Sequence, residues 1–123
     1  MNRLRKKVLL SIAAFCIFAM APVAAFAHAH PTKMNPAADS VGPAPAKLVV
    51  TFSEAVEPKF SSLQVDDASG KVLTTAKAEG VAGDAKTLTL ALPKLTAGGY
   101  VVKWVSVATD GHRLAGQYKF TVQ

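Results

Sequence analysis

Apolar and polar side chains alternate with a period of two over most of residues 47–122. Because successive side chains of a β-strand point to opposite faces, this alternation predicts strands that each have one buried face. The rows that we expect to face inward are Leu48, Val50 and Phe52; Leu63 and Val65; Leu88, Leu90 and Leu92; and Tyr118, Phe120 and Val122. No stretch after residue 27 has the apolar spacing of an amphipathic helix. The pattern therefore predicts an all-β chain.

Residues 100–106 are apolar on both faces apart from Lys103, which predicts a strand in the interior of a sheet. Tyr100 enters this strand after a glycine-containing turn, and its hydroxyl can bond to backbone upstream, as in the tyrosine corner of immunoglobulin-like domains. Trp104 lies on the same face and is predicted to fill the core. Together with an extended segment at residues 30–35, these strands predict an immunoglobulin-like antiparallel β-sandwich, or Greek-key barrel, of about seven strands.

Turn-forming residues separate the predicted strands. Residues 67–70, Asp-Ala-Ser-Gly, predict a turn that leads into a hairpin strand at 71–75. Residues 39–45, which contain Gly and Pro, and residues 76–86, which contain Gly and Asp, are predicted to be loops. The second loop has no Met, His or Cys, so it offers no soft metal ligand.

The first 27 residues have the order of a secretory signal peptide. Four basic side chains within the first seven residues precede an uncharged apolar run, which ends in a small-residue motif at Ala25 and Ala27. We expect cleavage after Ala27, which leaves residues 28–123 as one exported domain. The alternatives are a cut after Ala29 and an uncleaved membrane anchor, since about 20 apolar residues can span a bilayer.

The formal net charge of +6 belongs mostly to this leader. Four of the 14 Lys and Arg residues lie within it and all eight Asp and Glu residues lie beyond it, so residues 28–123 carry a net charge of +2. The remaining lysines are spread singly, without aromatic neighbours at regular spacing, and we therefore expect no nucleic-acid partner. The single cysteine, Cys16, also lies in the leader. The domain can thus form no disulfide, and it must hold any metal through nitrogen and oxygen.

The histidines are His28, His30 and His112. Cleavage after Ala27 would leave His28 with a free α-amine beside its imidazole, which is a two-point chelate. If residues 110–112 are extended, Asp110 and His112 project to the same side. With His28 they would offer three nitrogens and one oxygen, a set that suits tetragonal Cu(II). Plainer interpretations are that Asp110 only forms a turn with Gly111 and that the histidines are solvated.

His30 has a second candidate use. A free amine, two backbone amide nitrogens and a histidine at the third position can wrap Cu(II) or Ni(II) in a square plane, and His28-Ala29-His30 meets that requirement. This mode needs only a flexible tail, whereas a site made of His28, Asp110 and His112 needs the fold. Only the tail mode would survive denaturation.

Four segments stand in a recognisable order behind His28: residues 35–40 (NPAADS), 44–54 (APAKLVVTFSE), 95–104 (LTAGGYVVKW) and 110–112 (DGH). Together they resemble the CopC copper-resistance family over nearly all of residues 28–123. The resemblance implies a periplasmic immunoglobulin-like domain that holds Cu(II) through the N-terminal histidine and an Asp-x-His loop, which match His28, Asp110 and His112. It also suggests a CopD-like inner-membrane copper transporter as a partner.

The chain departs from part of this family in its methionine content. Some members carry a methionine-rich loop for Cu(I), but residues 76–86 contain no methionine, and Met34 is the one methionine of residues 28–123. One thioether cannot make the multi-sulfur site that Cu(I) prefers. We therefore expect one Cu(II) ion per chain and no dedicated Cu(I) site.

The leading hypothesis is a monomeric periplasmic Cu(II) carrier or buffer without enzymatic activity, acting in copper resistance and homeostasis. The alternative is an oxidative copper enzyme, because an amine and two imidazoles also resemble the histidine brace of polysaccharide monooxygenases. Against it, a small domain has few loops for a substrate surface, and the anionic Asp110 would favour the oxidised ion. A third hypothesis is a structural or adhesion module without a metal.

Overall fold

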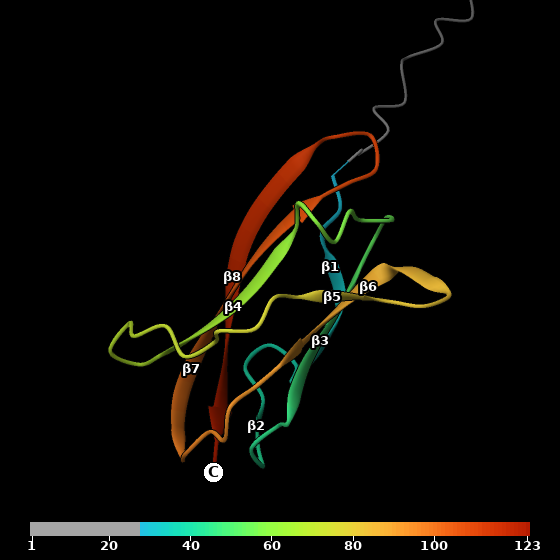
Figure 1. Ribbon diagram of the computed structural model, residues 1–123. Helices are drawn as coiled ribbons and strands as arrows, with labels where there is room; N and C mark the ends of the chain where they lie inside the picture. Colours follow the sequence, from blue (N-terminus) through green and yellow to red (C-terminus); the bar gives the residue numbers. More distant parts are fainter. Residues whose placement is uncertain (1–27) are drawn as a thin grey trace, which may run out of the picture.

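The computed structural model describes residues 28–123, which form eight strands and no helix (Figure 1). In chain order the strands are β1 (Pro31–Asn35), β2 (Val41–Gly42), β3 (Lys47–Phe52), β4 (Ser62–Asp67), β5 (Glu79–Val81), β6 (Asp84–Ala91), β7 (Gly98–Val107) and β8 (Arg113–Val122). No helix able to cross a membrane occurs in this part of the chain. The predicted leader, residues 1–27, lies outside the described residues.

The strands form two four-stranded sheets, with the orders β1-β3-β6-β5 and β2-β8-β7-β4. Every pairing between neighbouring strands is antiparallel except that of β2 with β8, which is parallel. The strand predicted to lie inside a sheet is β7, which pairs with β4 on one side and β8 on the other. The predicted all-β sandwich is confirmed.

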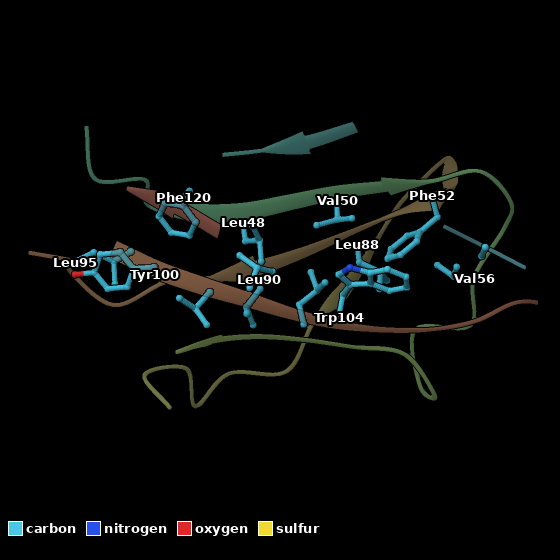
Figure 2. Close-up of a cluster of buried hydrophobic side chains, with 14 of the residues drawn as sticks. Leu48, Val50, Phe52, Val56, Leu88, Leu90, Leu95, Tyr100, Trp104 and Phe120 are labelled. Carbon is cyan, nitrogen blue, oxygen red and sulfur yellow. The ribbon is translucent and has the colours of Figure 1, made fainter. Parts of the chain in front are cut away.

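The predicted inward rows meet in one core between the two sheets. Figure 2 shows Tyr100, Phe120 and Leu95 at one end of this core and Trp104 and Phe52 at the other. The rings of Phe52 and Trp104 pack edge to face with centroids 5.9 Å apart, and Tyr100 stacks on Phe120 at 5.4 Å. Such aromatic pairs bury large apolar areas in favourable geometry. The packing role predicted for Trp104 is thus confirmed.

The tyrosine corner is present at the start of β7. The Tyr100 hydroxyl donates a hydrogen bond of 2.5 Å to the backbone carbonyl of Thr96, while the ring is only 6% exposed. A buried hydroxyl needs such a partner, because an unpaired polar group in the core is costly. This bond fixes the turn that leads into β7.

Two predicted loops contain short strands, so these predictions were partly wrong. Residues 39–45 include β2, and residues 76–86 include β5 and the first residues of β6. All three residues of β5 are exposed, and a strand without a buried face has no apolar alternation by which to recognise it. Gly83, with φ +79°, makes the tight turn between β5 and β6, a conformation that glycine adopts readily.

The hairpin predicted at residues 67–75 is correct in its turn and wrong in its second strand. The Asp67 carboxylate accepts the backbone N–H groups of Ser69 and Lys71, which closes the turn. Beyond it, the chain makes an isolated bridge between Val72 and Asp66 and a few single hydrogen bonds to β4, among them the N–H of Leu73 to the carbonyl of Val65. The segment therefore lies along β4 without extending the sheet.

Candidate metal centre

The segment ahead of β1 is fixed to the core at Ala29. This residue is fully buried, and its carbonyl accepts a hydrogen bond from the hydroxyl of Ser106, which is also fully buried. Pairing of β1 with β3 holds the segment from its other side, since the N–H of Ser53 donates to the carbonyl of His30 at 2.8 Å. Residues 28–30 are thereby held beside the loop that joins β7 to β8, as Figure 1 shows.

The side chain of Ser53 organises the two residues on either side of Ala29. Its Oγ accepts the backbone N–H of His30 at 3.1 Å and lies 3.1 Å from the Nδ1 atom of the His30 ring. The same oxygen lies 3.3 Å from the carbonyl oxygen of His28. A hydroxyl has one proton, so it donates to one of these two acceptors at a time. In this arrangement the ring of His30 is engaged with Ser53.

Asp110 and His112 come together through a turn. Gly111 has φ +90°, and its N–H donates to the carbonyl of Ala108, which reverses the chain. The turn that was the plainer interpretation of Asp110 and Gly111 is therefore present and the segment is not extended, although Asp110 and His112 still converge. Asp110 Oδ1 accepts the backbone N–H of His112 at 3.1 Å, and Oδ2 lies 3.0 Å from His112 Nδ1.

These contacts determine the charge and orientation of the pair. The hydrogen bonds from the His112 backbone and side chain lower the pKa of Asp110, so its carboxylate is charged at neutral pH. When Nδ1 of His112 carries the proton shared with Asp110, Nε2 presents a free lone pair, which is the form of imidazole that binds metals. Asp110 thus orients the ring and leaves Nε2 available.

The ring of His28 lies against the ring of His112. Their centroids are 5.3 Å apart, and the ring planes are inclined by 73°. A bond from a metal to an imidazole nitrogen is about 2 Å long, so two rings on one ion have centroids roughly 4.5 to 6.5 Å apart. The two rings fit a shared metal ion by this criterion. They come from distant parts of the chain, ahead of β1 and ahead of β8, and it is the fold that brings them together.

The structure does not gather the whole predicted ligand set. Within residues 28–123, no three His, Cys, Asp or Glu side chains are arranged as a metal-binding group. His112 contacts both other residues, but Asp110 is turned to His112 Nδ1. In the full chain the backbone nitrogen of His28 is also part of a peptide bond to Ala27. Ligation by His28, Asp110 and His112 therefore stays a prediction, as does any role for His30.

The donors at this end of the molecule are nitrogen and oxygen atoms. Met34, the one methionine of the described residues, is half-buried and packs against the hydrophobic core. Imidazole and carboxylate suit Cu(II), while thiolates and thioethers suit Cu(I). Such donors would favour Cu(II), and the oxidation state of the ion stays a prediction.

Sequence reasoning missed the two serines that position this end of the chain. Ser106 continues the inward row of Tyr100, Val102 and Trp104. A polar residue in an apolar row needs a hydrogen-bond partner, and that signal could have identified it. Ser53 follows the last strand residue of β3 and carried no such signal.

Known proteins resemble this chain in sequence and fold. Residues 31–123 match the CopC domain family. Protein YobA of Escherichia coli (strain K12) is 37% identical over 100 residues, covering 80% of this chain and 81% of that protein. Copper resistance protein C of Pseudomonas syringae pv. tomato is 34% identical over 109 residues, covering 82% and 86%. The crystal structure of CopC from Methylosinus trichosporium OB3b superposes with a TM-score of 0.73 at 37% identity, covering 78% and 94%.

Proposed function

Because the chain belongs to the CopC family, we propose that it is a periplasmic Cu(II)-binding protein of copper resistance and homeostasis. The observation that carries this proposal is the pairing of the His28 and His112 rings at 5.3 Å, in a geometry that one ion can share. The names of the relatives, which include copper resistance protein C, support copper as the ion.

The proposed site holds one Cu(II) ion per chain through His28, Asp110 and His112. His28 would supply its ring and, once Ala27 has been removed, its α-amine. His112 would supply Nε2, and Asp110 would either ligate the ion or hold the His112 ring through Nδ1. A carboxylate that orients a metal-binding histidine typically changes metal affinity by about 10- to 100-fold.

A carrier or buffer role accounts best for the position of the site. The side chains of His112 and Asp110 are 56% and 43% exposed, so an ion held there would be accessible to another protein. We propose that the protein acts as a monomer, is not an enzyme, and passes copper to a CopD-like inner-membrane transporter. An exposed site at the end of a small rigid sandwich is suited to such exchange.

The histidine-brace enzyme is the competing function, and it makes a distinct prediction. An oxidative enzyme would consume oxygen continuously when supplied with ascorbate and a polysaccharide, whereas a carrier would not. The charged Asp110 beside His112 would stabilise Cu(II) over Cu(I) and so slow reduction. Sustained oxygen consumption faster than that of free copper would favour the enzyme over the carrier.

Calorimetric titration tests the proposal directly. Protein comprising residues 28–123, with His28 as its first residue, should bind one equivalent of Cu(II) more tightly than micromolar. Cu(I) titrated under reducing conditions should bind more weakly, because the site has no sulfur ligand. If Cu(II) binds no more tightly than micromolar, the protein is better described as a structural module without a metal.

A further inference from the structure

The tripeptide His28-Ala29-His30 contains a second complete set of copper ligands. With a free amine at His28, the amine, the amide nitrogens of Ala29 and His30, and Nδ1 of the His30 ring can surround one ion in a square plane. Cu(II) and Ni(II) are the ions that favour this geometry. The two amide protons leave to solvent as their nitrogens bind the metal. To form the chelate, residues 28–30 must curl so that all four nitrogens point at one ion.

The fold holds these residues in a different arrangement. The amide N–H of His30, whose nitrogen the chelate needs, donates to Ser53 Oγ at 3.1 Å. Ala29 is fully buried, and its carbonyl accepts the hydroxyl of Ser106. Curling the tripeptide would withdraw Ala29 from the core and break both contacts. Losing the bond of Ser106 costs free energy because its hydroxyl is buried and would be left without a partner. Losing the exposed bond of Ser53 costs less, because water can replace it.

The two imidazoles also have other contacts in the fold. Nδ1 of His30, the ring nitrogen that the chelate would use, lies 3.1 Å from Ser53 Oγ and 3.4 Å from the carbonyl oxygen of His28, which is not a donor of the chelate. The His28 ring is packed against the ring of His112. Ser53 therefore engages two of the four nitrogens of the square-planar set.

We propose that Ser53 and Ser106 are specificity-determining residues that prevent square-planar chelation by His28-Ala29-His30. The folded protein then excludes Ni(II) from its N-terminus and keeps the amine of His28 free for ligation together with His112. The second consequence rests on the proposed function, whereas the exclusion of Ni(II) rests only on a free amine at His28. When only a minor, opened form can chelate, the apparent affinity falls by the fraction of that form. We expect folded protein to bind Ni(II) roughly 100-fold more weakly than the unfolded chain.

Titration with Ni(II) alone tests this proposal, with the visible absorption of square-planar Ni(II) as the signal. The protein comprises residues 28–123 with His28 first, and it is compared folded in buffer and unfolded in urea. The unfolded chain should develop the absorption at one equivalent, and unfolded His30→Ala should not. Folded protein should develop it only at much higher Ni(II). Equal Ni(II) affinity of the folded and unfolded chains would overturn the proposal.

Serine variants test whether these two contacts are responsible. Folded Ser53→Ala and the double variant Ser53→Ala with Ser106→Ala should bind Ni(II) about 10- to 100-fold more tightly than the wild type. Circular dichroism and Trp104 fluorescence establish that each variant is folded. Ser53→Ala alone suffices if the double variant does not fold, because the Ser53 hydroxyl lies outside the core. If folded Ser53→Ala binds Ni(II) no more tightly than the folded wild type, Ser53 does not prevent the chelation.

Cu(II) titration of His112→Ala separates the two proposals. If Cu(II) binding is unchanged by that substitution while Ni(II) stays excluded, the proposed copper site is wrong and the exclusion by the fold stands. If Cu(II) binding depends on His112 but Ni(II) binds folded and unfolded protein equally, the copper site stands and the specificity role is wrong.

Discussion

The two ends of strand β7 both carry polar side chains, but these are used in opposite ways. At the start of β7, the Tyr100 hydroxyl is buried and bonded to the carbonyl of Thr96. Beyond its other end, Asp110 holds the backbone and Nδ1 of His112, and the His112 side chain is 56% exposed. The first arrangement satisfies its polar group inside the fold and so stabilises structure. The second fixes a ring in position while leaving one nitrogen free, which is what a binding site requires.

Replacing His112 should have the largest effect, and it should lower Cu(II) affinity without lowering the stability of the fold. His112→Ala removes one of the two facing rings, and we expect Cu(II) affinity to fall by at least roughly 100-fold, given that second-shell changes alone cost about 10- to 100-fold. The free energy of unfolding without metal should change by less than about 0.5 kcal/mol, because the side chain is exposed. Calorimetry and urea denaturation measure the two effects. A large loss of stability would show that this end is structural after all.

Substitution of Gly116 tests how tightly the Trp104 ring packs against β8, between the two ends of β7. A Cβ atom at this position would lie 2.5 Å from Cζ2 of Trp104, so Gly116→Ala should destabilise the protein by about 2 kcal/mol through overpacking. Gly42→Ala is the matched control, since a Cβ there meets no atom within 4 Å. Thermal unfolding of both variants measures the difference. Equal stability would mean that the indole can move without cost.

The ion pair of Asp66 with Lys103 predicts how stability depends on pH. Lys103 Nζ lies 2.7 Å from Asp66 Oδ2, and this bond, with one from Gln64, lowers the pKa of Asp66. A carboxylate whose pKa is lower in the folded state stabilises the fold above its unfolded pKa, near 3.9, and loses that effect as pH falls through the folded pKa. Asp66→Asn should cost about 1.5 kcal/mol at pH 7 and less at pH 2. Urea denaturation at both pH values checks this; a cost independent of pH would contradict it.

Removing the tyrosine-corner hydroxyl should have the smallest effect on the free energy of unfolding. Tyr118, whose hydroxyl is also buried, provides a matched control. Tyr100→Phe leaves the carbonyl of Thr96 without its partner and should cost about 1 kcal/mol of stability, without changing Cu(II) affinity. The buried hydroxyl of Tyr118 has no hydrogen-bond partner among the described residues. Tyr118→Phe should therefore be neutral or stabilising. If both substitutions have the same effect on urea denaturation, the corner bond contributes nothing.

Sequence reasoning succeeded where burial imposes a pattern. The rows that begin at Leu48, Leu63 and Leu88 were predictable because alternating burial forces alternating polarity. Strand β5 was not, since all of its residues are exposed. The approach of Asp110 to His112 was expected on the condition of an extended segment, whereas the structure forms the alternative turn at Gly111 and still brings the two side chains together.

The proximity of His28 to His112 depends on contacts that no local pattern encodes. Ala29 is held in the core by the hydroxyl of Ser106, far along the chain, and by the pairing of β1 with β3. The grouping of these histidines was predicted from ligand chemistry and from the resemblance to CopC, whereas the strands were predicted from periodicity. The positioning roles of Ser53 and Ser106 became visible only in the folded structure.

We propose that removal of residues 1–27 completes a copper site that the fold has already prepared. The most direct test of this proposal compares the Cu(II) affinity of protein 28–123 with that of protein 27–123, which differs only by Ala27 in front of His28. We predict equal unfolding temperatures without copper and a Cu(II) affinity at least roughly 100-fold lower for the longer protein, since its His28 nitrogen is an amide. Equal Cu(II) affinity of the two proteins would contradict the account.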